Sequence, residues 1–252
     1  MSLPRFHCPL PLTAGTTIAL PADAFHHAVR VRRLRIDDAL LLFSGDGTEA
    51  LANIFAIRRD GADVVIAGVD TVDRESPLDV TLIQGISSGD RMDYTLQKAV
   101  ELGIHNIVPI ATLRSMPLSG ARADKRAAHW QQVVISACEQ SGRTRIPDVQ
   151  PVTKLADALA RGAIGVGDAS GAGAATCRVL LSESGSSRLS ALPRPAGPIA
   201  IVAGPEGGLT DAEENAAVDA GFIAVTLGPR TLRTETAAVA ALAAIQSLWG
   251  DG

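Results

Sequence analysis

The feature that most constrains the fold is a regular alternation, after residue 78, of short apolar runs with longer stretches of helical periodicity. The expected strands are Val80–Ile86, Asn106–Ile110, Ala163–Gly167, Pro198–Ala203 and Ile223–Leu227. The expected helices are Met92–Leu102, Lys125–Gln140, Asp211–Ala220 and Glu235–Trp249. Because parallel strands need crossover connections, this order predicts an α/β domain with a mostly parallel sheet covered on both faces.

Two of these helices carry boundary signals of their own. Thr210 and Glu213 have the spacing of a capping box at the start of the helix at 211–220, and Gly221 stands where a terminating glycine is expected. The last helix is apolar on nearly all sides between Ala237 and Ile245. It is therefore expected to lie between two layers, or between subunits.

The first 75 residues have a different character, with short strand-like runs separated by turns. The expected strands are Ala39–Phe43, Ala50–Ile57 and Asp63–Ala67, separated by the turn sequences SGDG at 44–47 and RDG at 59–61. A polar stretch that contains Pro77 follows. We therefore expect two domains, a β-rich one at 1–75 and the α/β one at 76–252.

Composition narrows the class of protein. The longest apolar stretch, Ala237–Ile245, is far shorter than the roughly 18 residues that cross a bilayer, and the opening MSLPRFHCPLPL lacks a signal-peptide core. We expect a cytoplasmic protein without membrane contact. The 3 cysteines are widely spaced and form no CxxC pair, which predicts neither a disulfide framework nor a metal site. The net charge of −4 means that any polyanionic partner must be held by local basic patches.

Two loops near the C-terminus carry the chemistry. The first, GPEGGL at 204–209, follows an apolar strand, which is where open parallel sheets bind ligands. Its glycines allow backbone to approach a ligand closely, although a tight turn alone would also use them. Glu206 argues against a phosphate, since its carboxylate would repel the anion.

The second loop, LGPRTLRTET at 227–236, has more charge and hydroxyl groups than a simple connection needs. Each residue has an ordinary alternative: Thr234 as the helix N-cap, Glu235 as a favourable charge at the helix start, and the arginines as solvated side chains. Their clustering beside a second glycine loop favours a functional site.

Two short basic segments are the candidates for RNA contact. HHAVRVRRLR at 26–35 contains no carboxylate, and its basic residues are His26, His27, Arg30, Arg32, Arg33 and Arg35. Arg143 and Arg145 form the second segment. Such clusters bind phosphate without reading sequence, although a solvated helix face is the alternative for 26–35. The apolar positions expected to face the interior there are Val29, Val31 and Leu34.

Taken together, GPEGGLT at 204–210 and LGPRTLRTET at 227–236 resemble the paired signature of the SPOUT superfamily of S-adenosylmethionine-dependent RNA methyltransferases, specifically the bacterial 16S rRNA uridine-N3 methyltransferases. Further matches in the same order are HHAVRVRRLR (26–35), LFSGDGTE (42–49), DRESPL (73–78), QKAVELGI (97–104), RS (114–115) and ACEQSGRTRIP (137–147). Two positions depart from the family's usual pattern: Ser88 stands where lysine is common, and Arg32 where leucine is common.

The resemblance implies a PUA-like β-barrel at 1–75 for RNA docking, then a SPOUT α/β domain with a C-terminal trefoil knot at approximately 196–252. It also implies S-adenosylmethionine as the methyl donor, a homodimer, and 16S rRNA or the small ribosomal subunit as the partner, without metal. A third loop for the methyl donor is expected at 167–171. The implied methyl-donor contacts are Gly204, Glu206, Gly207, Gly208, Leu227, Gly228 and Leu232.

The implied reaction needs two further groups, because uridine N3 carries a proton at neutral pH. Arg233 is the candidate that stabilises charge on the uracil carbonyl edge, and Arg230 is the candidate for a phosphate or carbonyl contact. Glu206 or Glu235 would accept the proton if burial raised its pKa, and water is the alternative acceptor. Two other functions stay open: 2′-O-ribose methylation of RNA, and a non-catalytic RNA-binding role in ribosome assembly.

Overall fold

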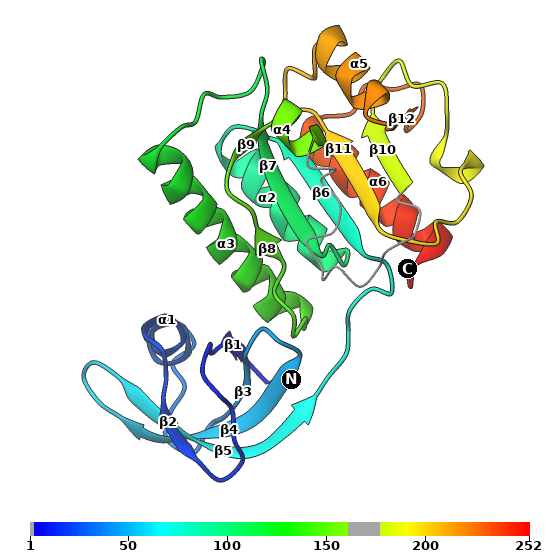
Figure 1. The fold of residues 1–252 in the computed structure, drawn as a ribbon. Coiled ribbons are helices and arrows are strands. Elements are labelled where there is room, and N and C mark those ends of the chain that lie inside the picture. The colour runs from blue at the N-terminus through cyan, green and yellow to red at the C-terminus, as the bar shows by residue number, and fades with distance from the viewer. Residues whose placement is uncertain (1–2, 161–176) are drawn as a thin grey trace. The chain divides into compact units, whose positions relative to one another are not determined.

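The computed structural model describes residues 3–160 and 177–252 (Figure 1). The chain forms two compact units: an N-terminal unit of Met1–Glu75 with Ile135–Ile146, and a C-terminal unit of Ser76–Val134 with Pro147–Gly252. The expected strand Ala163–Gly167 and the expected loop at 167–171 lie outside the described residues.

The N-terminal unit contains a five-stranded sheet in the order β1-β3-β4-β5-β2. Its strands are β1 (Arg5–His7), β2 (Thr17–Ala19), β3 (Ala39–Phe43), β4 (Thr48–Ile57) and β5 (Ala62–Thr71). The last three confirm the expected strands, whereas β1 and β2 are too short to show a period. Leu40, Leu42, Ile54 and Val64 are fully buried in its core.

The basic stretch at 26–35 is partly helical. Helix α1 (Ala22–Phe25) runs directly into η1, a π-helical segment at His26–Val31. Ala28 is buried in this segment, while Val31 is 58% exposed, so the expectation that Val31 faces the interior is wrong. An alternating pattern misplaces side chains here because helical neighbours share a face at three- to four-residue spacing.

The sequence placed residues 135–146 in the second domain, but in the structure they pack with the first unit. Gly47 N donates to Thr144 O at 3.1 Å, and the Thr144 hydroxyl donates to Val72 O at 2.6 Å. Ile146 N donates to Gly45 O at 3.2 Å. These bonds join residues far apart in the chain, which periodicity does not reveal.

The C-terminal unit contains a seven-stranded sheet in the order β12-β10-β11-β6-β7-β8, with β9 also paired to β7. The strands are β6 (Val80–Gly85), β7 (Asn106–Ala111), β8 (Asp148–Val149), β9 (Thr153–Lys154), β10 (Cys177–Leu181), β11 (Ile199–Ala203) and β12 (Ile223–Val225). Every pairing among the described residues of this sheet is parallel, which confirms the expected α/β class.

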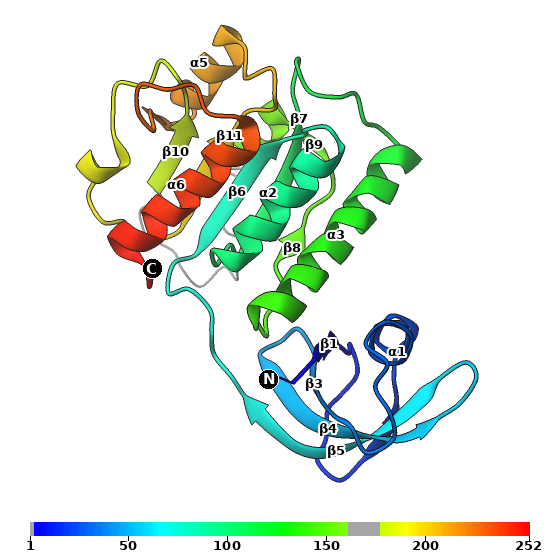
Figure 2. The ribbon, with the colours of Figure 1, turned by 180° about the vertical axis from the view of Figure 1, so that it is seen from behind.

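Helices cover both faces of this sheet. They are α2 (Gly89–Glu101), α3 (Ala121–Ser141), α4 (Leu155–Ala160), α5 (Asp211–Asp219) and α6 (Thr234–Trp249), with a short 3₁₀ segment η2 (Leu189–Ala191). Figures 1 and 2 show α2 and α6 side by side on one face. On the other face, Leu155 and Leu159 of α4 and Ala217 of α5 share a core cluster with Ile83 and Val202.

The helix boundaries follow local chemistry. Glu213 N donates to the Thr210 hydroxyl at 3.3 Å and Thr210 N donates to Glu213 Oε2 at 2.9 Å, which confirms the capping box. Gly221 ends α5 with a φ of +86°, as expected of a terminating glycine. Among the described residues, no helix is long and apolar enough to span a membrane. The trefoil knot stays a prediction.

Candidate active site

A cavity of about 730 Å³ opens at one end of the parallel sheet of the C-terminal unit. Leu181, Ala203 and Val225, the last residues of β10, β11 and β12, line it together with the loops that follow them. Arg91 from α2 and Arg114 from the loop after β7 also line it. The cavity therefore lies at the carboxyl ends of parallel strands, the position at which α/β sheets bind ligands.

The two glycine loops predicted to carry the chemistry meet in this cavity. The lining includes all the predicted methyl-donor contacts, Gly204, Glu206, Gly207, Gly208, Leu227, Gly228 and Leu232. It also includes the predicted catalytic residues Arg230, Arg233 and Glu235. The structure thus brings these residues together, while their individual roles stay predictions.

The first loop is a tight turn pressed against a neighbouring strand. Gly208 N donates to Pro205 O at 2.9 Å, and Gly208 has a φ of +68°, which favours glycine. A Cβ on Gly85, the last residue of β6, would collide with Pro205 N, so only glycine fits there. Gly85 was not singled out, although a glycine at the end of an apolar strand was the available signal.

Thr234 ties the two loops together. Its hydroxyl donates to Gly204 O at 2.6 Å and accepts from Gln84 Nε2 at 3.2 Å. The interpretation of Thr234 as the N-cap is therefore wrong: Arg233 is the N-cap residue, with extended backbone, and Thr234 is the first residue of α6. The buried Gln84 also donates to Gly204 O at 3.3 Å, so one strand end fixes both loops.

Glu206 is held as a charged hydrogen-bond acceptor. Its Oε1 accepts from Ser88 N and from Arg91 Nη1, each at 2.9 Å, and from the Ser88 hydroxyl. Partial burial by itself would raise the pKa of Glu206, but the hydrogen bonds from Ser88 and Arg91 outweigh it and lower the pKa to about 2. Glu206 is therefore ionised at neutral pH and unsuited to accept a proton.

Glu235 has different surroundings. Its Oε1 lies 4.0 Å from Arg91 Nε, and its side chain is 18% exposed. Its Oε2 is buried and has no hydrogen-bond partner among the described residues. Because Glu235 lines the cavity, its carboxylate can accept from an N–H or O–H group of a ligand.

Arg230 and Arg233 bring positive charge to the same wall. Both side chains belong to exposed residues, and within residues 3–160 and 177–252 neither forms an ion pair. Their guanidinium groups are therefore available to phosphate or carbonyl oxygens.

A further group of polar residues in the cavity lining was not predicted from the sequence. The Ser182 hydroxyl donates to Glu214 Oε2 at 2.8 Å, and the Ser184 hydroxyl donates to the same oxygen at 3.4 Å. All three residues line the cavity. The loop of Ser182 and Ser184 follows β10, a five-residue strand whose pattern was not recognised, so nothing pointed to its end as a ligand position.

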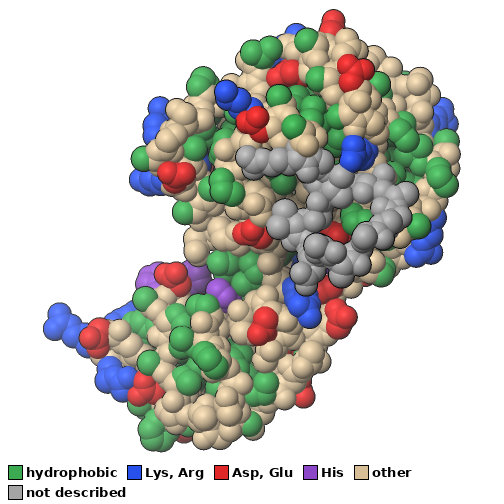
Figure 3. All heavy atoms as spheres, in the orientation of Figure 1, with side chains coloured by type: hydrophobic (Ala, Val, Ile, Leu, Met, Phe, Trp, Pro, Cys, Tyr) green, Lys and Arg blue, Asp and Glu red, His purple; other side chains and the backbone are tan. Residues whose placement is uncertain are grey.

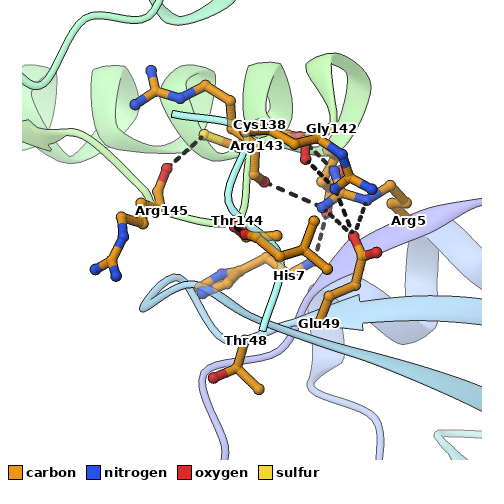
Figure 4. Close-up of polar contacts among 12 residues, drawn as sticks. Arg5, His7, Thr48, Glu49, Cys138, Gly142, Arg143, Thr144 and Arg145 are labelled. Carbon is orange, nitrogen blue, oxygen red and sulfur yellow. Dashed lines mark hydrogen bonds and ion pairs between the residues drawn. The ribbon is translucent and has the colours of Figure 1, made fainter. Parts of the chain in front are cut away.

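The predicted RNA contacts lie on the N-terminal unit, and one of them needs correction. Arg143 is only 5% exposed, and its Nε donates to Glu75 Oε2 at 2.8 Å. Because Glu75 neutralises this buried guanidinium, the prediction that Arg143 is a free surface cation is wrong. Arg145 is exposed, and Figure 4 shows its side chain pointing away from this network.

The same close-up explains how residues 135–146 are held. Arg5 Nη1 donates to Cys138 O at 2.9 Å, and its Nε donates to Glu49 Oε2 at 2.9 Å (Figure 4). Arg74 Nη1 donates to Gly142 O at 2.9 Å. Two cations thus satisfy carbonyls at the end of α3, where the helix dipole favours positive charge.

The stretch at 26–35 remains a surface feature. Its exposed basic residues are His26, His27, Arg30, Arg32, Arg33 and Arg35. Arg30 has partners of its own, since Nη2 donates to Arg59 O at 2.6 Å and the guanidinium lies over the Phe25 ring. Figure 3 shows basic side chains of this unit next to acidic ones on the face in view, so that face is not uniformly positive.

Comparison with known families supports both units. Residues 74–246 match the family described as RNA methyltransferase domain, and residues 20–67 match the RNA methyltransferase PUA domain. The ribosomal RNA small subunit methyltransferase E of Bacillus subtilis is 32% identical over 91% of this chain and 89% of its own length. The protein of that name from Mycobacterium tuberculosis is 34% identical over 92% of this chain and 86% of its own length.

Solved structures of methyltransferases are similar to this chain over its whole length. The ribosomal RNA small subunit methyltransferase E of Neisseria gonorrhoeae, bound to S-adenosyl methionine, is 44% identical with a TM-score of 0.88 and covers 99% of both chains. A putative methyltransferase of Legionella pneumophila, in complex with the same cofactor, is 34% identical with a TM-score of 0.91 and covers 100% of both chains.

A PUA-type β unit joined to a parallel α/β unit with glycine loops at the strand ends defines the SPOUT class of RNA methyltransferases. Within that class, the chain belongs to the family of ribosomal RNA small subunit methyltransferase E.

Proposed function

We propose that this protein transfers a methyl group from S-adenosylmethionine to N3 of a uridine in 16S rRNA. The observation that carries the proposal is one cavity lined by both glycine loops, by Arg230 and Arg233, which form no ion pair among the described residues, and by the carboxylate of Glu235. The solved structures with bound S-adenosyl methionine support the donor, the names of the relatives support an rRNA substrate, and the cavity supports the chemistry.

The cavity suits the methyl donor in size and in the groups it offers. A volume of about 730 Å³ lies within the roughly 300–1,000 Å³ of small-molecule sites. Gly204, Gly207, Gly208 and Gly228 let backbone approach a nucleoside closely. The acidic side chains on the wall, including Glu214, suit a ligand that carries an ammonium and a sulfonium charge. The donor supplies an activated methyl group that is displaced directly from sulfur.

The chain's own residues then have separate tasks. Glu235, whose carboxylate lines the cavity, accepts the N3 proton, because Glu206 is held ionised by hydrogen bonds from Ser88 and Arg91. Arg233 stabilises the negative charge that develops on the uracil carbonyl edge, and Arg230 contacts phosphate or carbonyl. As N3 forms its bond to the methyl carbon, the bond from carbon to sulfur breaks. The loops contribute by holding these atoms in line.

RNA docking is proposed for the N-terminal unit, through His26, Arg30, Arg32, Arg33, Arg35 and Arg145. The target base must be unpaired or flipped out, because N3 lies on the pairing edge. We also propose that the protein acts as a homodimer in the cytoplasm, and that 16S rRNA alone or within the small subunit is the partner.

The decisive test is methyl transfer to rRNA that lacks the modification. Wild-type protein with labelled S-adenosylmethionine is expected to label 16S rRNA, and nucleoside mass spectrometry is expected to find 3-methyluridine. A 2′-O-methyl product would establish ribose methylation instead. Binding of the methyl donor without transfer to any rRNA would support the assembly role.

Arg233→Ala tests the catalytic assignment. Loss of its guanidinium is expected to lower the single-turnover rate by about 10²-fold, the size typical of a lost charge-stabilising group. Binding of the methyl donor, measured by calorimetry, should change little. A single-turnover rate equal to that of wild type would remove Arg233 from the mechanism.

A further inference from the structure

Arg114 lies at the edge of the cavity, yet the reaction proposed above gives it no task. It belongs to the pair RS at 114–115, in the loop after β7. Its Nη1 donates to two backbone carbonyls of the neighbouring glycine loop, Gly207 O at 3.0 Å and Leu209 O at 3.1 Å. One side chain thus braces a loop that follows a different strand.

The two peptide groups that Arg114 holds are also fixed from their other side. The first carries the N–H of Gly208, which donates to Pro205 O at 2.9 Å. The second carries the N–H of Thr210, which donates to Glu213 Oε2 at 2.9 Å. Each peptide plane is held at both ends, and Arg114 supplies one end in both cases.

The loop that carries Arg114 is itself braced. The Ser115 hydroxyl donates to Thr112 O at 3.0 Å and accepts from Thr112 N at 2.9 Å, which closes a turn. Leu113 N donates to Glu213 Oε1 at 2.9 Å. Glu213 therefore accepts from the loop after β7 on Oε1 and from the end of the glycine loop on Oε2. The backbone that carries Arg114 is thus held in place.

Close packing accompanies these bonds. A Cβ on Gly207 would lie 3.0 Å from the Arg114 Cβ, which is tighter than ordinary contact. From the sequence, we expected glycine at 207 because a ligand approaches the backbone there. The structure shows a second reason, which is that the Arg114 side chain packs against Gly207. Among the described residues, the amide groups of Gly207 and Leu209 have no backbone hydrogen-bond partner.

We propose that Arg114 is a positioning residue for the methyl donor. By holding the carbonyls of Gly207 and Leu209, it keeps the loop in the conformation that offers its amide groups to the cavity. This inference rests on the proposed function. A pocket made of backbone groups has few side chains that adjust to a ligand, so the loop conformation sets its affinity.

The test compares binding of the methyl donor with turnover. In calorimetry with S-adenosylmethionine and no RNA, Arg114→Ala is expected to raise Kd about tenfold or more, because two hydrogen bonds from a charged group are lost. At saturating methyl donor, its turnover should stay within about threefold of wild type, since only binding is affected. Arg114→Lys should lie between, because an ammonium lacks the planar guanidinium geometry.

Arg122→Ala is the matched control, since Arg122 is exposed near the start of α3. It should leave Kd unchanged, and its thermal unfolding without ligand should equal that of the wild type. A wild-type Kd in Arg114→Ala with a raised KM for RNA would overturn the proposal and make Arg114 a substrate contact. If Arg114→Ala does not fold, an unchanged Kd in Arg114→Lys has the same meaning. Failure of the wild type to bind the methyl donor would instead overturn the proposed function, and this inference with it.

Discussion

Two carboxylates on one cavity wall have opposite hydrogen-bonding states, and this separates their tasks. Glu206 accepts from Ser88 and Arg91, which lower its pKa to about 2. Because this folded-state pKa lies below the ordinary value, the stabilisation is complete above about pH 4.5 and is lost as pH falls toward 2. Between pH 5 and 9 the charge of Glu206 is therefore constant, whereas Oε2 of Glu235 has no hydrogen-bond partner among the described residues.

The single-turnover rate tests this separation. Glu235→Gln is expected to lower the rate by about 10²–10⁴-fold, because the proton acceptor is lost. Glu206→Gln is the matched control: it should lower the rate only through weaker loop positioning. A Glu235→Gln variant with the wild-type rate would assign proton removal to water.

The residues of the site were predictable only where they are contiguous. Gly204 to Leu209 and Leu227 to Thr236 form two unbroken stretches, so their composition was visible in the sequence. Ser182 and Glu214 are 32 positions apart and meet only because β10 lies beside the start of α5. Ser88 and Arg91 reach Glu206 across more than 100 positions for the same kind of reason.

At the scale of elements, each of the two glycine loops is anchored by the start of the helix that follows it. Helix α5 begins with the capping box of Thr210 and Glu213, directly after the first glycine loop. Helix α6 begins at Thr234, whose hydroxyl holds Gly204 O. The helix starts therefore fix the ends of both glycine loops.

Thr210→Ala tests the contribution of the capping box. Loss of the hydroxyl that accepts from Glu213 N is expected to lower the free energy of unfolding by about 1 kcal/mol, the usual value of an N-cap. Urea unfolding measures the change. Thr210→Ser should retain most of the stability, and Thr236→Ala, at an exposed position in the first turn of α6, should change it by less than about 0.5 kcal/mol. Equal stability of Thr210→Ala and wild type would contradict the role of the cap.

Long elements were predicted better than short ones. The helices α2, α3, α5 and α6 were recognised because their helical patterns extend over several turns or because a cap marks their start. β10 and α4, with five and six residues, offer too few positions to show a period. β12 ends at Val225 rather than at Leu227, because the Thr226 hydroxyl accepts from Gly228 N at 3.3 Å and begins a turn.

For the whole molecule, the charges divide into those that hold the fold and those that remain at the surface. Arg5 and Arg143 are buried or nearly so and are paired with Glu49 and Glu75. Removal of one member of such a buried pair costs about 3–5 kcal/mol, so these arginines are unsuited to tests of RNA binding. With a net charge of −4, only local surface cations remain to attract RNA.

Arg32, Arg33 and Arg35 are the suitable targets, because Arg30 already has partners within the unit. Arg33 has a φ of +59°, so asparagine, which tolerates this conformation, is the better neutral replacement there. The triple change Arg32→Ala, Arg33→Asn and Arg35→Ala is expected to weaken rRNA binding. It should reduce the slope of log K against log salt by about 2, from the loss of three phosphate contacts at about 0.7 each.

Arg58→Ala provides the control for this experiment. Arg58 lies in the same unit and is paired with Asp63. Because the carboxylate already neutralises it, its removal should leave the salt slope unchanged. Filter binding of rRNA at several salt concentrations measures both variants. An unaltered slope in the triple variant would mean that the stretch at 26–35 does not contact RNA, and docking would then have to depend on cations elsewhere, such as Arg145 or those at the cavity.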